Sequence, residues 1–524
     1  MNRPLRTAVL AAGLASSAVA NDLQERVNAE FCLNRSEILR LDLPDTVETP
    51  FTLDVQIAGL PYIIDLAPRS LRAPDHRVLA QQDDGSWLEV DPGPVRTYAG
   101  DLVGDEGAWV RASLHDDGLW ARIHTSSGED YWIEPLVGRV RGATFEDHVL
   151  YNGVDSNCGG GWCGADLIPD NDQKPFIPGD DVGPADESIW IAEMAIDCDF
   201  PFHNQYGGVS GAQNRVTSVI NAMNGQYEND VTITNQITTI LVRSSSSQDP
   251  YTTTDPGGLL SQFRGEWNSN QAGIPRDYAT LFTGRNLDGS VIGIAYLGVI
   301  CTSSGYNVCQ NLSSFSCATD LSAHECGHNW NADHCSCSGF TMNPSLTCAN
   351  NFNKTETTPD IFNHRNSRNC LDLDLGGTVI FRDRFNDGDL LDDGWTRKNF
   401  KANARKAADF EGTHGVKTLY QSWAARAVST VGFSTIRLEF AHRVLQYEGS
   451  EGLIVQWSGD GGSSWNTIAT LTASTWKEKS YVLPSGAGNN ANFAVRFLGG
   501  GVGKNSTNGK KKKYHIDDVR ILGE

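Results

Sequence analysis

The chain has 524 residues, 39% of them hydrophobic and 9% aromatic, which is the composition of a globular protein long enough for about three domains. Its formal net charge of −22 disfavours nucleic acid as a partner, because a polyanion would be repelled. No segment is long and apolar enough to span a bilayer, so we predict no transmembrane segment.

The first 20 residues predict a secretory signal peptide. Arg3 and Arg6 precede a short apolar run, and Ala18-Val19-Ala20 offers a small-residue cleavage site. A buried N-terminal helix is the alternative. We therefore expect a secreted, extracellular protein, in which most of the 12 cysteines pair. No cysteine follows Cys370, so the C-terminal part is expected to fold without disulfides.

Residues 21–166 predict a β-rich region. The segment Gly107–Leu136 alternates apolar and polar residues between glycine-containing turns, as a β meander does. Residues 167–188 are acidic, rich in proline and without periodicity. That composition indicates an exposed linker, where proteolytic processing concentrates.

Residues 189–375 predict a mixed α/β domain. Its expected strands start at Ile189, Val231 and Val291, and the third is expected to run to Cys301. Apolar residues at helical spacing place a helix between the first two strands. A second helix is expected after the third strand. Strand, helix, strand, strand, helix is the order of a mixed α/β unit.

Residues 376–524 have a different pattern, with short strands separated by Gly, Asp and Ser turns. This pattern predicts an all-β sandwich. The fold class expected for the whole chain is therefore multi-domain, with a β-rich region, a mixed α/β domain and a β-sandwich.

The segment His324–His328 reads H-E-C-G-H. On a helix, residues four apart lie on the same face, so both imidazoles can bind one metal ion with Glu325 beside its open position. His334 can supply a third ligand if the helix ends before it and the chain turns sharply. Three unrelated histidines are the alternative. The pattern predicts one catalytic zinc ion and Glu325 as the general base.

The segment HECGHNWNADH resembles the extended zinc motif of the metzincin metalloproteases, H-E-x-x-H-x-x-G-x-x-H. Met342 falls where that family places its Met-turn, although alone it would be a plain core residue. The stretches DYATLFTGRNLDGSVIGIAYLGVIC and YWIEPL resemble the adamalysin or reprolysin branch. Asn331 replaces the family glycine, and asparagine tolerates the left-handed turn required there. Cys335 replaces the branch's aspartate. Neither departure removes a catalytic group.

This resemblance implies a metalloendopeptidase that is made as a zymogen, acts on protein or peptide substrates and is inhibited by its own propeptide. It also implies that Cys301 pairs with Cys370. Strand addition would bring an extended substrate against one edge strand, which includes Gly293, Ile294, Ala295 and Tyr296. An ordinary sheet strand is the alternative for these four residues.

Two cysteines just before the linker are candidates for a cysteine switch. Cys158 and Cys163 are each followed by glycine, and a thiolate could occupy the water site on zinc. We favour Cys163, with a disulfide between the two cysteines as the alternative. Cleavage between Asp166 and Ser188 would release the inhibitor.

The C-terminal region resembles the jelly-roll or MAM-like modules of secreted bacterial hydrolases, which bind polysaccharide, cell surfaces or substrate, or only aid secretion. Asp517 and Asp518 are candidate calcium ligands or plain solvated acids. A catalytically inactive metzincin scaffold that acts in adhesion is the second hypothesis for the function, and a small-peptide or cell-wall amidase is the third. The intact set of three histidines and Glu325 favours the protease.

Overall fold

The computed structural model describes residues 23–157, 160–168, 189–368, 370–374, 378–383, 385, 394–403, 415–445, 452–499 and 513–523. The chain divides into two compact units, residues 1–374 and 375–524, and each is described by itself. The predicted signal peptide and most of the predicted linker lie outside the described residues. Within the described part, no helix is long and apolar enough to cross a membrane.

The first unit begins with a helix over residues 23–30 and an eight-stranded antiparallel sheet in the order β1-β10-β9-β8-β7-β6-β3-β2. Its strands are β1 (Glu37–Arg40), β2 (Phe51–Ile57), β3 (Leu60–Pro68), β6 (Thr97–Leu102), β7 (Trp109–His115), β8 (Gly118–His124), β9 (Asp130–Pro135) and β10 (Asp147–Asn152). The expected meander is present as β7, β8 and β9. Alternate residues of β2, namely Leu53, Val55 and Ile57, face the core of this sheet.

A nine-stranded sheet forms the centre of the same unit, in the order β11-β15-β16-β14-β12-β13-β4-β5 with β17 beside β12. Its strands are β4 (Arg72–Gln81), β5 (Trp87–Val90), β11 (Trp162–Cys163), β12 (Ile189–Cys198), β13 (Ile233–Val242), β14 (Tyr278–Thr283), β15 (Val291–Ala295), β16 (Tyr306–Gln310) and β17 (Asp372–Asp374). The region before the predicted linker therefore supplies strands at both ends of this sheet: β4 and β5 at one and β11 at the other.

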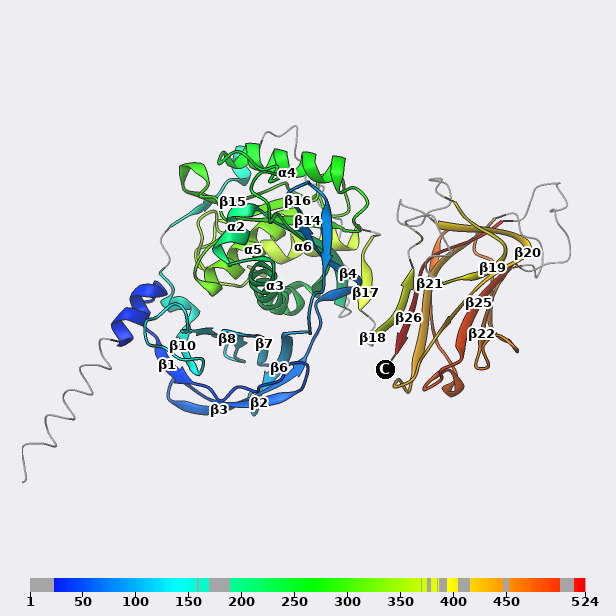
Figure 1. The fold of residues 1–524 in the computed structure, drawn as a ribbon, viewed down its shortest axis with the longest axis horizontal. Coiled ribbons are helices and arrows are strands. Elements are labelled where there is room, and N and C mark those ends of the chain that lie inside the picture. Colours follow the sequence, from blue (N-terminus) through cyan, green and yellow to red (C-terminus); the bar gives the residue numbers. More distant parts are fainter. Residues whose placement is uncertain are drawn as a thin grey trace, which may run out of the picture. The chain divides into compact units, whose positions relative to one another are not determined.

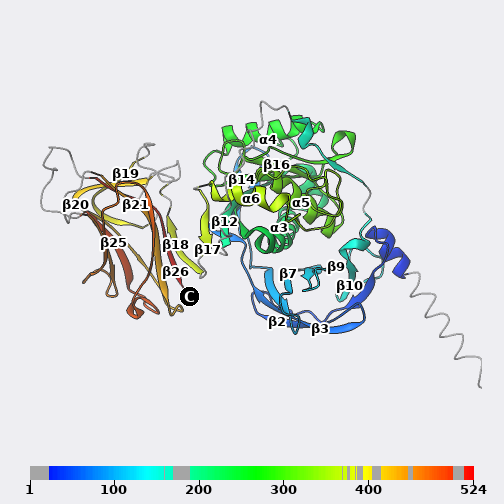
Figure 2. The same cartoon turned by 180° about the vertical axis from the view of Figure 1, so that it is seen from behind.

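Five helices pack around this sheet: α2 (Phe200–Gln205), α3 (Val209–Val231), α4 (Pro256–Asn270), α5 (Phe315–Asn329) and α6 (Thr357–Asn366). Met194 and Ile196 of β12 share a core with α3 and α5, whereas Ala195 between them packs with α4. The helices therefore cover opposite faces of the sheet, and α3 lies between β13 and the N-terminal strand β7 (Figures 1 and 2). The mixed α/β arrangement is as predicted.

The strand predicted from Val291 to Cys301 is shorter than expected. Strand β15 ends at Ala295, because the chain turns at Gly298, whose φ is +65°. Strand β14 and helix α4 were not predicted. Helix α4 starts where the Asp255 side chain accepts a hydrogen bond from the Gly258 amide, with Pro256 in the first turn.

The described residues of the second unit form strands joined by turns and loops, with one short 3₁₀ helix among them, as expected for an all-β region. The strands are β18 (Thr378–Asp383), β19 (Thr396–Asn403), β20 (Gly415–Val428), β21 (Ile436–Leu445), β22 (Leu453–Ser458), β23 (Asn466–Leu471), β24 (Lys477–Val482), β25 (Phe493–Gly499) and β26 (Lys513–Gly523). They share one apolar core that includes Phe440, Val455, Phe497 and Ile516. Their packing as a two-layer sandwich stays a prediction.

Candidate metal centre

Helix α5 carries the H-E-C-G-H segment and ends directly after it. Ser314 caps its first turn by accepting a hydrogen bond from the Cys317 amide. Asn331 then takes a left-handed conformation with φ +72°, and its amide donates to the His328 carbonyl at 2.8 Å. The asparagine therefore makes the turn that was expected of it, and the chain comes back to place His334 beside the helix.

Three histidines converge at this turn. The Nε2 atoms of His324 and His328 lie 3.1 Å apart, and the ring centroid of His334 is 5.3 Å from the first ring and 4.8 Å from the second. One ligand atom from each histidine and the Cys163 sulfur all lie within 4.8 Å of one another. The helix and the turn thus bring together the three histidines that the sequence singled out.

The surrounding backbone fixes how two of these rings are oriented. The Nδ1 atoms of His324 and His328 lie 2.6 Å and 2.8 Å from the carbonyl oxygens of Thr341 and Ala332. A carbonyl only accepts hydrogen bonds, so each Nδ1 carries the proton and each Nε2 turns a lone pair inward. The His334 Nε2 is buried without a hydrogen-bond partner.

The donor set fits zinc. Two imidazole nitrogens on one tetrahedral zinc ion lie about 3.3 Å apart, given bonds of about 2.0–2.1 Å, and the pair here is close to that. Burial, with a smaller effect of His334, lowers the pKa of His324 to about 3. Burial also lowers the pKa of His328 well below its ordinary value. These two imidazoles are therefore neutral, as metal ligation requires.

Glu325 lies beside the three histidines in a fully buried position. Its Oε1 has no hydrogen-bond partner, and its Oε2 lies 3.5 Å from the Cys163 sulfur. Strand β15 passes directly over the carboxylate, since a Cβ on Gly293 would lie only 2.3 Å from Oε1. Burial raises the pKa of Glu325 to about 8.

Cys163 is the switch candidate that the structure places at this site. It is a buried, free thiol 3.4 Å from the His328 Nε2. Burial, and then the nearby Glu325, raise its pKa well above the ordinary value, so in this geometry the thiol keeps its proton. Cys158 lies outside the described residues.

The backbone around Cys163 is held on two sides. On one side β11 pairs in parallel with β15, and the Gly164 amide donates to the Gly293 carbonyl at 2.8 Å. On the other side the Cys163 amide donates to the Pro344 carbonyl at 2.9 Å. The segment therefore lies along the edge of β15 that does not pair with β16.

Gly293, Ile294 and Ala295 belong to β15, which makes it the strand that faces β11. Tyr296 follows the end of the strand, although its amide still donates to the Tyr306 carbonyl at 3.3 Å. Three of the four predicted edge residues therefore lie in the strand.

Met342 lies beneath α5, fully buried, in contact with Gly327, where an added Cβ would lie 2.6 Å from the sulfur. Disulfides join Cys301 to Cys370, as the resemblance implied, and also Cys317 to Cys348 and Cys335 to Cys337.

Three of the nine cysteines from Cys198 onward are free thiols. These are Cys198, Cys309 and Cys326, all buried. Cys326 lies between the first two histidines on α5, and its sulfur is 3.3 Å from the Tyr278 hydroxyl.

Asp320 is a residue of the site that the sequence analysis missed. It is fully buried and accepts hydrogen bonds from the Thr341 hydroxyl at 2.7 Å and the Asn350 amide at 2.9 Å. It thereby holds the segment whose Thr341 carbonyl orients His324. Its position one helical turn before His324 was the only sequence signal.

Asp517 and Asp518, the candidate calcium ligands, lie on β26. Both are buried, so they are not plain solvated acids. Arg382 donates to the Asp518 carboxylate at 3.0 Å, and Arg520 lies 3.6 Å from it. These guanidinium groups supply the positive charge that a cation would bring.

Residues 189–361 match a family model for reprolysins, which is described as metallo-peptidase family M12. Zinc metalloproteinase-disintegrin-like atrase-B of Naja atra is 26% identical over 325 residues, covering 56% of this chain and 51% of its own length. Hemorrhagic metalloproteinase-disintegrin-like kaouthiagin of Naja kaouthia is 33% identical over 125 residues, covering 23% of this chain and 30% of its own. The chain thus spans about half the length, or less, of these two relatives.

Among solved structures, metalloproteinase-II from Bacteroides fragilis superposes with a TM-score of 0.38 at 12% identity. The superposition covers 60% of this chain and 91% of that one.

Proposed function

We propose that the chain, whose residues 189–361 are a reprolysin-like metzincin domain of metallo-peptidase family M12, is a secreted zinc endopeptidase made as a zymogen. The observation that carries this proposal is the convergence of three histidine side chains next to the buried carboxylate of Glu325. We assign residues 21–166 as propeptide, 167–188 as processing linker and 189–375 as the catalytic domain.

His324, His328 and His334 would hold the zinc ion, with Met342 beneath the helix that carries the first two. Zinc bound there would polarise the scissile carbonyl and lower the pKa of the attacking water. Glu325 would accept the proton of that water and pass it to the leaving amine. The backbone of β15 would hold an extended substrate by strand pairing, in the place that β11 takes here.

Cys163 would keep the zymogen latent. Its sulfur lies beside His328 and Glu325, where the attacking water must stand. Its protonated state reflects burial near a carboxylate, and a cation at the site would favour the thiolate instead. Cutting the linker would allow the segment around Cys163 to leave the cleft.

The second unit, residues 376–524 as predicted, would bind a polysaccharide or a cell-surface ligand. This unit contains no cysteine, and it has an apolar core of its own.

The test is hydrolysis of casein by the processed form, with chelation and zinc re-addition, compared with Glu325→Ala. We expect chelation to abolish hydrolysis, zinc to restore it, and Glu325→Ala to lower it by about 10³-fold with zinc content unchanged. Glu356→Ala, at an exposed glutamate of the same domain, is the matched control. A folded protein that binds one zinc ion yet cuts nothing would contradict the proposal and favour the binding scaffold.

A further inference from the structure

One face of α3 is polar and yet buried. Residues at spacings of three and four along the helix lie on this face, which we call the α3 stripe: Ser218, Asn221, Gly225 and Glu228. Buried helix faces are normally apolar, so a buried polar face needs partners. All the partners described below come from the region that precedes the linker.

The middle of the α3 stripe binds N-terminal strands directly. The Asn221 amide donates to the carbonyls of Ala112 at 2.7 Å and Tyr98 at 3.2 Å. One turn earlier, the Ser218 hydroxyl lies 2.7 Å from the Nε2 of His115. These hydrogen bonds tie α3 to β6 and β7.

Glu228 forms the charged end of the stripe. Its carboxylate accepts two hydrogen bonds from Arg69, at 2.6 Å and 2.9 Å, and one from Arg111 at 2.5 Å. The side chains of Glu228 and Arg111 are only 10% and 11% exposed, so solvent screens this contact weakly. Two guanidinium groups on one carboxylate are a strong and directional contact.

Gly225 leaves room on the α3 stripe for the side chain of Trp109. A Cβ at this position would lie 2.2 Å from the indole ring of Trp109, so the ring fits only where a side chain is missing. Arg122 lies over the same indole and donates to the Ala222 carbonyl at 3.2 Å. A glycine lowers helix stability, so its presence here is explained by the fit of Trp109.

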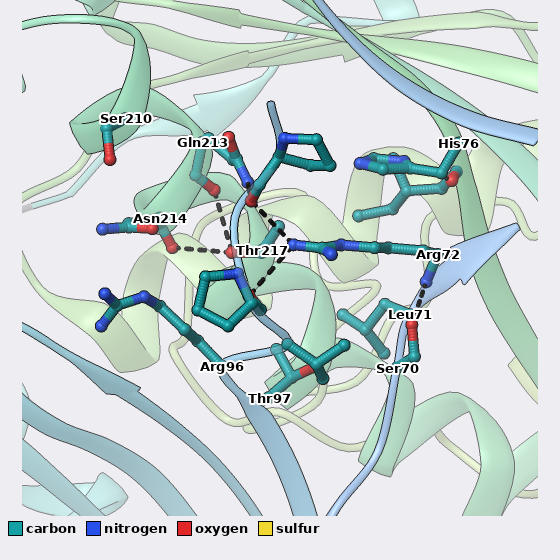
Figure 3. Close-up of a pocket in the computed structure, with 14 residues that line it drawn as sticks. Ser70, Leu71, Arg72, His76, Arg96, Thr97, Ser210, Gln213, Asn214 and Thr217 are labelled. Atoms are coloured by element: carbon teal, nitrogen blue, oxygen red, sulfur yellow. Dashed lines mark hydrogen bonds between the residues drawn. The ribbon is translucent and has the colours of Figure 1, made fainter. Parts of the chain in front are cut away.

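The other end of α3 is also covered by the N-terminal region. Gln213 donates to the Pro92 carbonyl at 2.8 Å, and Arg72 donates to the same carbonyl from the opposite side of a small cavity of about 60 Å³ (Figure 3). The whole length of the helix is thus covered by residues that precede the linker.

We propose that the α3 stripe is a docking surface on which the propeptide stays bound after the linker is cut. A surface of hydroxyl, amide and carboxylate groups can face water when its partner leaves, whereas an apolar one would aggregate. Cutting the linker then yields a two-chain complex that is still latent. This inference rests on the proposed function, since it takes residues 167–188 as the processing site and Cys163 as the inhibitor.

The experiment uses the full chain with the recognition sequence of a site-specific protease inserted between Asp180 and Asp181. After cutting, we expect both fragments to co-elute in size-exclusion chromatography at micromolar concentration, with casein hydrolysis still low. Glu228→Ala should raise the dissociation constant of the two fragments by roughly thirtyfold or more, because it leaves the nearly buried guanidinium of Arg111 and the partly exposed one of Arg69 without their carboxylate.

Gly225→Ala is the second variant and guards against a folding artefact. Alanine favours the helix, so separation of its fragments cannot be blamed on loss of α3. Glu25→Gln, at an exposed carboxyl of the propeptide, should behave as the unmodified chain does. Wild-type fragments that separate after cutting, or two α3 variants that bind as tightly as wild type, would overturn the proposal.

Elution does not depend on catalysis, so the two proposals can fail separately. Fragments that stay together in wild type and separate in both variants support the docking surface even if the protein never cuts casein. That result would contradict only the proposal that the chain is a protease, and it would leave the proposed docking surface standing.

Discussion

The nine-stranded sheet of the first unit is extended at both ends by the N-terminal region, in two different ways. Beside β15, next to the histidines, it contributes the two-residue strand β11. Beside β13 it contributes the ten-residue strand β4, which adds β5 in turn. The short strand lies where chemistry is expected, and the long one lies far from it along the sheet.

The two contacts also differ in what they bury. Strand β4 places Val78 and Leu79 into the cores on opposite faces of the sheet. Strand β11 places only Trp162 against one of these cores, and it is otherwise held by hydrogen bonds to β15, Gly289 and Pro344. The N-terminal region is therefore anchored at β13 and only inserted at β15. A segment inserted in this way can leave the site without unfolding its anchor, as the proposed role of Cys163 requires.

The largest effect is expected at the anchor. Leu79→Ala removes a buried side chain that packs with Leu241, and it should lower the local stability of the β4–β13 pair by about 2–5 kcal/mol. Hydrogen exchange of the amides in these two strands measures this loss. Leu88→Ala is the control, since Leu88 on β5 is 55% exposed. Equal protection in both variants would show that β4 is not an anchor.

At the other end, the close approach of β15 to the carboxylate should control activity. Gly293→Ala would force Glu325 away from its place and lower casein hydrolysis by the processed form about 10²-fold. The protection of β4 should not change, which separates the two ends of the sheet. Gly265→Ala on α4, where a Cβ meets nothing within 4 Å, is the matched control. Unchanged activity would contradict the role given to Glu325.

The inserted segment should be easier to disable than the anchor. Cys163→Ser keeps the shape of the side chain and replaces a good zinc ligand with a poor one, so the uncut chain should gain at least about tenfold in casein hydrolysis. The control is Cys32→Ser, because Cys32 is an exposed free thiol far from the site in sequence. An uncut Cys163→Ser variant as inactive as wild type would mean that β11 blocks the cleft without its thiol.

The site could be predicted in large part because its geometry is local. The spacing of His324 and His328 fixes their common face, and Asn331 is one of the few residues that tolerate the turn that returns His334. The end of β15 was placed too late, because the left-handed turn at Gly298 depends on its contact with Asn331, which is distant in sequence.

The anchor could not be predicted, because parallel pairing of β4 with β13 joins segments about 160 residues apart and leaves no local pattern. For the same reason, the sequence did not predict that two acidic residues, Asp320 and Asp166, lie next to the site. In the sequence, Asp320 looks like an ordinary helix residue, and Asp166 looks like the last residue before the linker. Only the folded chain places Asp166 next to His334.

Asp166 provides the smallest predicted effect at the inserted end. Its carboxylate lies 3.4 Å from the Nδ1 of His334, but the Asp166 side chain is 71% exposed. Exposed pairs contribute about 0–1 kcal/mol, so Asp166→Asn should raise casein hydrolysis by the uncut chain less than about fivefold.

This small effect should shrink further in high salt, because exposed charges are screened. Asp42→Asn, at an exposed acid with no described ion pair, is the control for the change in net charge. A rise as large as that expected for Cys163→Ser would mean that the segment is held by its charge on His334. In that case the backbone pairing of β11 with β15 would not be what keeps the inserted end in place, and the contrast between the two ends of the sheet would rest on electrostatics.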